Sequence, residues 1–243
     1  MELSAERIRA QLGMPELPVY VYETLTSTSD ECRRLLAAGE RQCLVLAPRQ
    51  TGGRGRSGKT FYAPEGGLYL SLAMPMPEDA ALLTCRAAVV TAETVEDVSG
   101  ISCGIKWVND LYLHGRKVCG ILTEAVPGSV IVGIGVNLSP APVPEALEGV
   151  MGFLDCGDLR EALSVGIVRR MLRQEDDGRM MEAYRQRSVV LGRELVCTAG
   201  TRRFSARALE IDDAGGLVVQ GPAGRETLRF GEVSVRGDFS EYR

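Results

Sequence analysis

The sequence GRGRSGKTFYAPEGGLYLSLAM, residues 53–74, decides whether this chain can adopt a P-loop fold. Its first eight residues match G-x-x-x-x-G-K-T, the phosphate-binding loop of the P-loop proteins. In those proteins a strand precedes the loop, and the N-terminus of a following α-helix completes the phosphate site. Here a proline and two glycines follow within residues 64–67, and residues 68–74 alternate like a strand. The helix that a P-loop requires is therefore excluded.

The same loop contains two arginines that alternate with glycines. Arg54 and Arg56 are two residues apart, so in an extended loop their side chains project to the same side. The glycines allow the backbone to approach an anion closely, and Lys59 adds a third positive charge. This pattern predicts a site for a polyphosphate or an acyl phosphate. The alternative is a loop whose charges are simply solvated.

The composition is that of an ordinary globular protein, with 45% hydrophobic and 25% charged residues among 243. This length fits one large domain, or a catalytic domain with a small appendage. The net charge of −4 gives no overall attraction to nucleic acid, so we expect no DNA partner. The first residues lack the apolar segment of a signal peptide, and no apolar run approaches the length of a membrane span. We therefore expect a cytoplasmic protein without a membrane partner.

Cysteine and histidine usage limits the possible chemistry. Seven cysteines lie mostly in apolar segments without C-x-x-C spacing, which favours reduced, buried thiols, with a reactive thiol as the alternative. His114 is the only histidine, which excludes H-E-x-x-H zinc sites and metal centres with two histidines. We expect His114 at the surface, in the turn of LYLHGRK (residues 111–117). Chemistry is then expected to rest on arginine, lysine, carboxylates and backbone N–H groups.

Hydrophobic periodicity predicts an α+β fold with a mixed central sheet packed by helices. Ser27 or Thr28 can cap a helix that Gly39 ends. Short strands that follow one another without intervening helices, including a hairpin that turns at Gly115, favour a mixed or antiparallel sheet. The expected strands are residues 19–23, 43–48, 67–74, 104–108, 110–113, 118–125 and 129–138, and the expected helices are residues 26–40 and 79–98, with more between 158 and 187.

The residue pattern of the sequence changes at Leu191. Short strands separated by Gly, Asp-Asp and Gly-Pro turns follow, and they predict a small C-terminal SH3-like β-barrel. The expected strands are residues 193–200, 202–212, 216–222 and 225–236. We place the boundary near residues 188–192, which gives a catalytic domain of residues 1–188 and a barrel domain of residues 189–243.

Five motifs of this sequence occur in the order and spacing seen in biotin protein ligases. They are TST, RQTGGRGRSGK, GLYLSL, KWVNDLYLHGRKVCGILTE and IVGIGVNLS. The similarity extends from about residue 19 to the C-terminal barrel, and the chain resembles the short type of this family, without an N-terminal DNA-binding domain. The resemblance implies a class II synthetase-like catalytic domain. It also implies an enzyme that makes biotinyl-5′-AMP from biotin and ATP with Mg²⁺, and then transfers the biotinyl group to a lysine of a biotin carboxyl carrier domain of acetyl-CoA carboxylase or a similar carboxylase.

The resemblance also implies which residues bind biotin. They are Ser27, Thr28, Ser29, Gln50, Gly53, Arg54, Gly55, Arg56, Trp107, Lys117 and Gly120, with Leu70 as further apolar wall. The hydroxyl and amide side chains would hold the ureido ring, although helix capping also explains Ser27 and Thr28. Core packing is the alternative for Leu70 and Trp107.

Catalysis and nucleotide binding are assigned by the same resemblance. The catalytic residues would be Arg54, Arg56, Lys117 and Asp110, and the nucleotide would contact Arg54, Arg56, Lys59, Asn109, Asp110 and Asn137. Asp110 would also bind Mg²⁺, which prefers carboxylate and phosphate oxygens. An exposed hairpin lysine is the alternative for Lys117, and an ordinary turn is the alternative for Asn109 and Asp110.

Three positions depart from the family pattern. Val108 stands where the family usually has proline, Lys59 stands in place of arginine, and Phe61 in place of tryptophan. Lys59 keeps its charge but loses bidentate geometry, so the departures bear on rate and affinity more than on activity. The competing hypotheses are a lipoate-type ligase, or a biotinyl-AMP-binding regulator or scaffold without transfer activity. The oligomeric state, monomer or homodimer, stays open.

Overall fold

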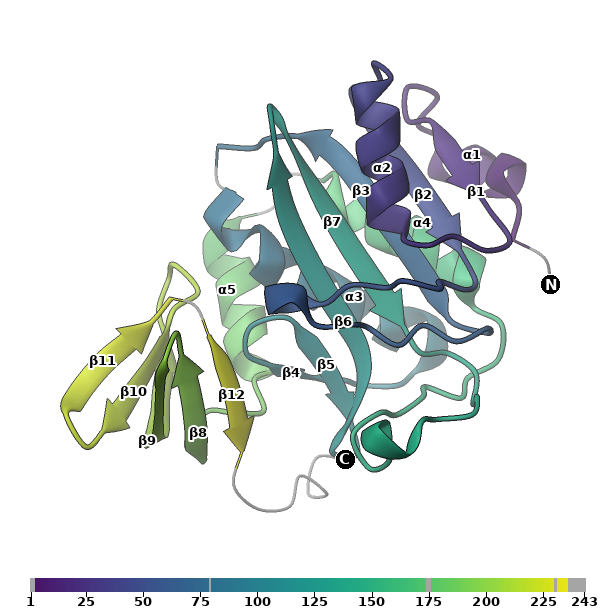
Figure 1. The fold of residues 1–243 in the computed structure, drawn as a ribbon. Coiled ribbons are helices and arrows are strands. Elements are labelled where there is room, and N and C mark those ends of the chain that lie inside the picture. Colours follow the sequence, from purple (N-terminus) through teal and green to yellow (C-terminus); the bar gives the residue numbers. More distant parts are fainter. Residues whose placement is uncertain (1–2, 79, 174–175, 230, 236–243) are drawn as a thin grey trace.

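The structure is a computed structural model that describes residues 3–78, 80–173, 176–229 and 231–235 (Figure 1). The strands of its central sheet are β1 (Val19–Val21), β2 (Cys43–Ala47), β3 (Leu68–Pro75), β4 (Gly104–Lys106), β5 (Asp110–Leu113), β6 (Arg116–Val126) and β7 (Ser129–Val136). Over the described residues this sheet has the strand order β1-β2-β3-β7-β6-β5-β4. β1 and β2 are parallel, and the other neighbouring strands are antiparallel. The predicted α+β fold with a mixed sheet is confirmed.

Helices cover both faces of the sheet (Figure 1). On one face α2 (Thr28–Ala37) contacts β2, β3 and β7. On the other, α3 (Leu83–Ser99) contacts β4, β5 and β6, and α4 (Arg160–Met171) contacts β3. α5 (Asp177–Gln186) packs against α3, and α1 (Ala5–Leu12) packs against α4. We call the first face the α2 face.

The alternation of side chains along β7 separates the two faces. Its even-numbered residues from 130 to 136 are buried in the core that contains α3 and α4, whereas Ile131 packs under α2. Because successive side chains point to opposite faces, Gly133 and Gly135 lie on the α2 face with Ile131. The register pairs Gly133 with Ser71 of β3 and Gly135 with Gly120 of β6, so these residues share that face. β7 is therefore hydrophobic on the face that packs in the core with α3 and α4, and it carries the small residues Gly133 and Gly135 on the α2 face.

Helix α2 begins where the sequence predicts. Ser27 is its N-cap, and the Ser27 hydroxyl accepts a hydrogen bond from the backbone N–H of Asp30 at 3.4 Å. The helix ends at Ala37, and Gly39 follows with φ of 107°, a value that favours glycine. The first turn of α2 consequently presents Thr28 and Ser29 to Ser71 of β3, in the interior of the sheet.

The helix expected at residues 79–98 begins later than predicted. A 3₁₀ turn, Ala80–Leu82, precedes α3, which ends at Ser99 with Gly100 in the left-handed conformation. Leu82 at the N-cap position offers no side-chain hydrogen bond, so a tighter turn leads into the helix. Asp79, the expected first residue, lies outside the described residues.

The C-terminal strands form a second, antiparallel sheet, which agrees with the predicted SH3-like unit. They are β8 (Glu194–Ala199), β9 (Arg202–Ile211), β10 (Leu217–Gly221), β11 (Gly224–Leu228) and β12 (Glu232–Val235), in the order β11-β10-β9-β8-β12. The segment 225–236 was expected as one strand, but it contributes to two, because β11 pairs with β10 while β12 pairs with β8. The expected boundary at residue 188 falls between α5 and β8, and the expected end of the barrel at residues 236–243 lies outside the described residues.

Polar contacts join the two sheets. The Trp107 indole N–H donates to the carbonyl of Gly215, in the β9–β10 turn, at 2.9 Å. Arg185 of α5 donates through Nε to the carbonyl of Ile211 at 2.7 Å. These contacts fix the second sheet beside the turn between β4 and β5.

The thiols and the histidine lie as expected. All seven cysteines are free, and all but Cys156 are buried. His114 is exposed in the β5–β6 turn, where His114 and Gly115 have φ of 47° and 74°. No helix in the described ranges is long and apolar enough to cross a membrane.

Candidate active site

A pocket of about 730 Å³ opens beside the N-terminus of α2, a size typical of small-molecule sites. Its wall combines the start of α2, residues 54–62, the turn between β4 and β5, residues 144–151 and strand β12. Apart from Gly53, every residue assigned above to biotin or nucleotide lines this pocket. Their roles stay predictions, but the fold brings the residues together from distant parts of the chain.

Three glycines on the α2 face form the floor of the pocket. A Cβ atom at Gly120 would lie 2.8 Å from Phe61 Cε2, and one at Gly135 would lie 2.7 Å from Phe61 Cε1. A Cβ atom at Gly133 would lie 2.9 Å from the Ser29 hydroxyl oxygen. Each distance is shorter than a normal carbon contact, so a side chain here would displace the groups that lie on the floor.

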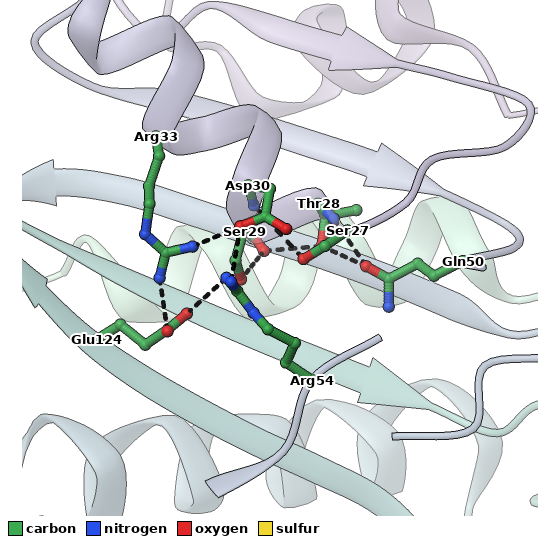
Figure 2. Close-up of polar contacts among 9 residues, drawn as sticks. Ser27, Thr28, Ser29, Asp30, Arg33, Gln50, Arg54 and Glu124 are labelled. Carbon is green, nitrogen blue, oxygen red and sulfur yellow. Dashed lines mark hydrogen bonds and ion pairs between the residues drawn. The ribbon is translucent and has the colours of Figure 1, made fainter. Parts of the chain in front are cut away.

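A row of hydrogen-bonded hydroxyl groups lies at one end of the pocket, and Figure 2 shows its labelled members beside the start of α2. Thr28 donates to Gln50 Oε1 through its backbone N–H at 2.7 Å and through Oγ1 at 3.1 Å. The Ser71 hydroxyl lies 2.8 Å from Thr28 Oγ1 and 3.0 Å from Ser29 Oγ. We call Ser29, Ser71, Thr28 and Gln50 the hydroxyl chain.

The number of hydroxyl protons determines which group donates and which accepts in each hydrogen bond of the hydroxyl chain. A hydroxyl has one proton to donate, and Thr28 uses its proton on Gln50. Ser71 must then donate to Thr28, and Ser29 must donate to Ser71. The lone pairs of Thr28 and Ser29 remain as acceptors, while the Gln50 amide nitrogen remains as a donor.

Residues 53–61 form a hairpin over the floor. Phe61 N–H donates to the carbonyl of Gly53 at 2.9 Å, and Gly55 N–H donates to the carbonyl of Lys59 at 2.7 Å. A Cβ atom at Gly53 would lie 2.5 Å from the carbonyl oxygen of Phe61, which explains glycine at the base of the hairpin. Arg56–Gly58 form a 3₁₀ turn, and the next regular element is β3 rather than a helix. The exclusion of a P-loop is confirmed.

The side chains of the hairpin contact three different elements. Arg54 forms ion pairs with Asp30 at 2.8 Å and with Glu124 at 3.5 Å (Figure 2). Arg56 donates to Asn109 Oδ1 at 3.3 Å. Both arginines line the pocket, but they bind different partners, and a 3₁₀ turn that starts at Arg56 interrupts the extended backbone between them.

Lys59 joins the hairpin to the second sheet. Its ammonium group lies 2.5 Å from Glu232 of β12, and its side chain is 64% exposed. Contact with the outgoing phosphates, as predicted, would therefore require Lys59 to exchange Glu232 for a phosphate oxygen.

Two further lysines line the pocket on β4 and β6. Lys117 lies 2.7 Å from Asp110 and 5.6 Å from the centre of the Phe61 ring. Lys106 donates to the Tyr112 hydroxyl at 3.2 Å and forms no ion pair with a carboxylate among the described residues. Burial lowers the pKa of Lys106 from its ordinary value, and the charge of Lys117 lowers it further, whereas Asp110 opposes the shift.

Trp107 and Asn137 are both largely buried. The Trp107 indole bridges to the second sheet as well as lining the pocket, so core packing and pocket wall are combined in one side chain. Asn137 Nδ2 donates to the carbonyl of Gly152 at 3.0 Å. Its Oδ1 is buried without a hydrogen-bond partner in the described part of the chain, which leaves an acceptor beside the pocket.

The donor set fits a magnesium ion that arrives with a nucleotide. The described residues contain no cluster of three or more His, Cys, Asp or Glu side chains that could hold a metal ion. Asp110 binds Lys117 through Oδ1, which leaves Oδ2 for a cation. One carboxylate together with phosphate oxygens and water is a common Mg²⁺ environment.

Several residues in or beside the pocket were missed from the sequence. Lys106, Gly133, Gly135 and Glu232 line the pocket. Asp30, Ser71 and Glu124 contact residues that line it. Two glycines spaced two apart in an apolar strand signal a close approach on one face, so Gly133 and Gly135 could have been found. Ser71 interrupts the leucine run of β3 and could have been noticed as a polar residue in a buried strand. Glu232 carried no such signal, because its contact depends on how the two sheets meet.

The chain is similar to known proteins over most of its length. Residues 20–140 match the model of the biotin/lipoate A/B protein ligase family, and residues 190–236 match that of the biotin protein ligase C-terminal domain. The chain is 32% identical over 235 residues to a biotin–[acetyl-CoA-carboxylase] ligase of Paracoccus denitrificans, covering 87% of this chain and 98% of the relative. It is 28% identical over 240 residues to the bifunctional ligase/repressor BirA of Bacillus subtilis, covering 88% of this chain and 73% of the relative.

Solved structures show the same fold. The biotin protein ligase of Aquifex aeolicus in complex with biotin and ATP superposes with a TM-score of 0.77 at 25% identity, covering 90% of this chain and 98% of that chain. The family models, the extent of the match to the Paracoccus ligase and this fold lead to one conclusion. The chain belongs to the biotin protein ligase family.

Proposed function

We propose that this protein activates biotin with ATP as biotinyl-5′-AMP and transfers the biotinyl group to one lysine of a carboxylase carrier domain. The observation that carries the proposal is one pocket that is lined both by Thr28, Ser29 and Gln50 of the neutral hydroxyl chain and by a cluster of cations. A biotinyl group needs the hydroxyl chain, and a nucleotide phosphate needs the cations. Similarity to a named biotin–[acetyl-CoA-carboxylase] ligase and to a ligase solved with biotin and ATP supports it.

The hydroxyl chain suits the ureido ring of biotin. That ring has two N–H donors and one carbonyl acceptor and carries no charge. The chain offers acceptors at Thr28 and Ser29 and a donor at Gln50, which is the complementary set. A substrate that lacks a ureido group would leave these buried groups without partners, at a cost in affinity.

The cations suit the adenylation step. The biotin carboxylate oxygen attacks the α-phosphorus, and the bond to the oxygen that bridges the α- and β-phosphates breaks, so that pyrophosphate leaves. Two anions must meet, and positive charge has to offset their repulsion. We assign this role to Arg56 and Lys117, with Lys106 toward the leaving phosphates. Arg56 and Lys106 contact only neutral groups among the described residues, so their charges are available to a ligand.

We assign the nucleotide contacts that the family resemblance implies. Asn109, Asp110 and Asn137 would contact the nucleotide, and Asp110 would hold the Mg²⁺ of Mg-ATP, which supplies further positive charge to the phosphates. The unpartnered Asn137 Oδ1 supports a polar contact in this region. In the transfer step the carrier lysine attacks the acyl carbon, AMP leaves with the electron pair, and Asp110 would accept the proton that the amine loses.

The test is a transfer assay with the whole chain. The protein is incubated with biotin, Mg-ATP and the carrier domain of an acetyl-CoA carboxylase, and the carrier is weighed by mass spectrometry. We expect the mass of one biotinyl group on a single lysine. A parallel reaction with lipoate and a lipoyl domain should give no product, and transfer of lipoate in place of biotin would overturn the proposal.

The formation of the intermediate is measured separately. Without the carrier we expect stoichiometric biotinyl-AMP and release of pyrophosphate. Biotinyl-AMP without any transfer to the carrier would instead identify a protein that binds the adenylate without being a ligase of carriers.

A further inference from the structure

The tip of the 53–61 hairpin depends on side chains for its position. At its base, Gly52 N–H donates to the carbonyl of Thr26 at 2.8 Å, which ties the chain to the segment before α2. Beyond Gly53 the backbone hydrogen bonds among the described residues close on the hairpin itself. The tip therefore takes its place over the floor through the contacts of Arg54, Arg56 and Lys59.

Arg54 has the most extensive of these contacts. It belongs to a cluster of four charged residues, Asp30, Arg33, Arg54 and Glu124, which Figure 2 shows between α2 and the hairpin. Asp30 Oδ1 lies 2.8 Å from Arg54 and 2.8 Å from Arg33. Glu124 lies 3.5 Å from Arg54 and 2.5 Å from Arg33. We call these residues the ion-pair cluster.

The ion-pair cluster joins three elements. Asp30 and Arg33 lie on α2, Glu124 lies on β6, and Arg54 comes from the hairpin. Arg33 bonds both carboxylates, so it holds them in place for Arg54. The side chains are between 24% and 45% exposed, so each pair alone is weak, but a network loses less conformational entropy per contact.

The ion-pair cluster also determines how much of the positive charge of Arg54 is available to a ligand. Two carboxylates face Arg54, whereas Arg56 and Lys106 face neutral groups. A cation already paired with two carboxylates adds little to the field at a phosphate. Its geometry is better suited to holding the hairpin than to neutralising a ligand.

We propose that Asp30 and Glu124 are positioning residues of the site: through Arg54 they seat the hairpin against the hydroxyl chain and thereby set the affinity for biotin. The inference rests on the proposed function for the identity of the ligand. The seating of the hairpin itself is independent of that identity.

The first measurement is therefore hydrogen exchange of the protein alone. Asp30→Asn and Glu124→Gln remove one charge each and keep the side-chain shape. We expect the amides of residues 53–61 to exchange about two- to fivefold faster in each variant, with α3 unchanged. Glu210→Gln is the matched control, because it removes an exposed ion pair with Arg225, and neither residue lines the pocket. Unchanged exchange in both cluster variants would overturn the proposal.

The second measurement is the KM for biotin in adenylate formation. We expect each carboxylate variant to raise this KM about two- to fivefold while kcat stays within about twofold, because a seated hairpin contributes to binding. Arg54→Gln should raise the KM for biotin by about the product of the factors found for Asp30→Asn and Glu124→Gln. Glu210→Gln should leave it unchanged.

A double-mutant cycle separates positioning from general destabilisation. If Asp30 and Glu124 act through Arg54, then Glu124→Gln in the Arg54→Gln background changes neither the KM nor the exchange further. Fully additive effects would overturn the proposal. A wild-type protein that makes no biotinyl-AMP would overturn the proposed function instead, and the exchange data would still decide whether the cluster seats the hairpin.

Discussion

The ammonium group of Lys117 lies 2.7 Å from a carboxylate oxygen of Asp110, across the paired strands β6 and β5. Both side chains are partly exposed to the pocket, at 27% and 20%. A ligand carboxylate that contacts Lys117 must therefore share this ammonium with Asp110. The pairing also keeps Lys117 beside the Phe61 ring before any ligand binds.

Lys117→Gln should slow adenylate formation. The variant removes the positive charge that we place beside the biotin carboxylate and the α-phosphate, and the loss of one such group costs about 100-fold or more in rate. Single-turnover formation of biotinyl-AMP measures the effect. Arg116→Gln, next to it in β6 and exposed, is the control and should keep the wild-type rate. A Lys117→Gln variant with full activity would show that the charge acts elsewhere.

Lys106 should give the affinity for Mg-ATP a pH dependence. Burial lowers the pKa of Lys106, so its ammonium loses the proton at a lower pH than an exposed lysine does. The charge is present below that lowered pKa and disappears as the pH rises through it. We therefore expect the KM for Mg-ATP to rise with pH on the alkaline side of neutrality.

Two substitutions isolate this contribution. Lys106→Arg keeps a charge that does not titrate in this range and should flatten the pH profile. Lys106→Met should raise the KM about tenfold at neutral pH, since one charge-assisted contact is lost. An identical pH profile in wild type and Lys106→Arg would exclude Lys106 from the phosphate region.

Gly120→Ala should block the floor of the pocket. The added methyl group would lie 2.8 Å from the Phe61 ring and 3.1 Å from Lys117 Nζ, so both must move. We expect adenylate formation to fall by about tenfold or more, because small displacements of catalytic groups are costly. Gly178→Ala adds the same methyl group at an exposed position of α5 and should have no effect on activity. Equal activity of the two variants would mean that the floor tolerates a side chain.

Ser71→Ala should break the hydroxyl chain. Thr28 and Ser29 would each lose a partner, so we expect the free energy of unfolding to fall by about 1–2 kcal/mol and the KM for biotin to rise several-fold. Ser164→Ala is the matched control, because its fully buried hydroxyl bonds a helix carbonyl away from the pocket. Ser164→Ala should lower stability without changing the KM. Thermal unfolding and steady-state kinetics on the same preparations test both effects.

The sequence predicted most of the fold because its signals are local. Alternation found the strands, Ser27 and Gly39 marked the ends of α2, and the His114-Gly115 turn closed the β5–β6 hairpin. Errors occurred where local signals were weak. α3 starts after a 3₁₀ turn, and no capping residue in the sequence indicates that start. Residues 225–236 contribute to two strands because their partner strands lie in different parts of the sheet.

The site was predictable in part for the same reason. The loop glycines and basic residues are contiguous in sequence, so their common location was clear. Asp30 and Glu124 read as ordinary surface charges, and only the packing of α2 against β7 brings them to Arg54. Lys106 looked like a strand residue, and its burial appears only once β12 and the β4–β5 turn lie side by side in the pocket wall.

The ion pair between Lys59 and Glu232 joins residues 173 positions apart. During translation, at roughly 5–20 residues per second, the hairpin emerges on the order of ten seconds before the strand that anchors its far side. A nascent chain can complete the sheet, the floor and the hydroxyl chain during this time, but its pocket still lacks one wall. Full substrate affinity should therefore appear only after strand β12 has paired with β8 and brought Glu232 to Lys59.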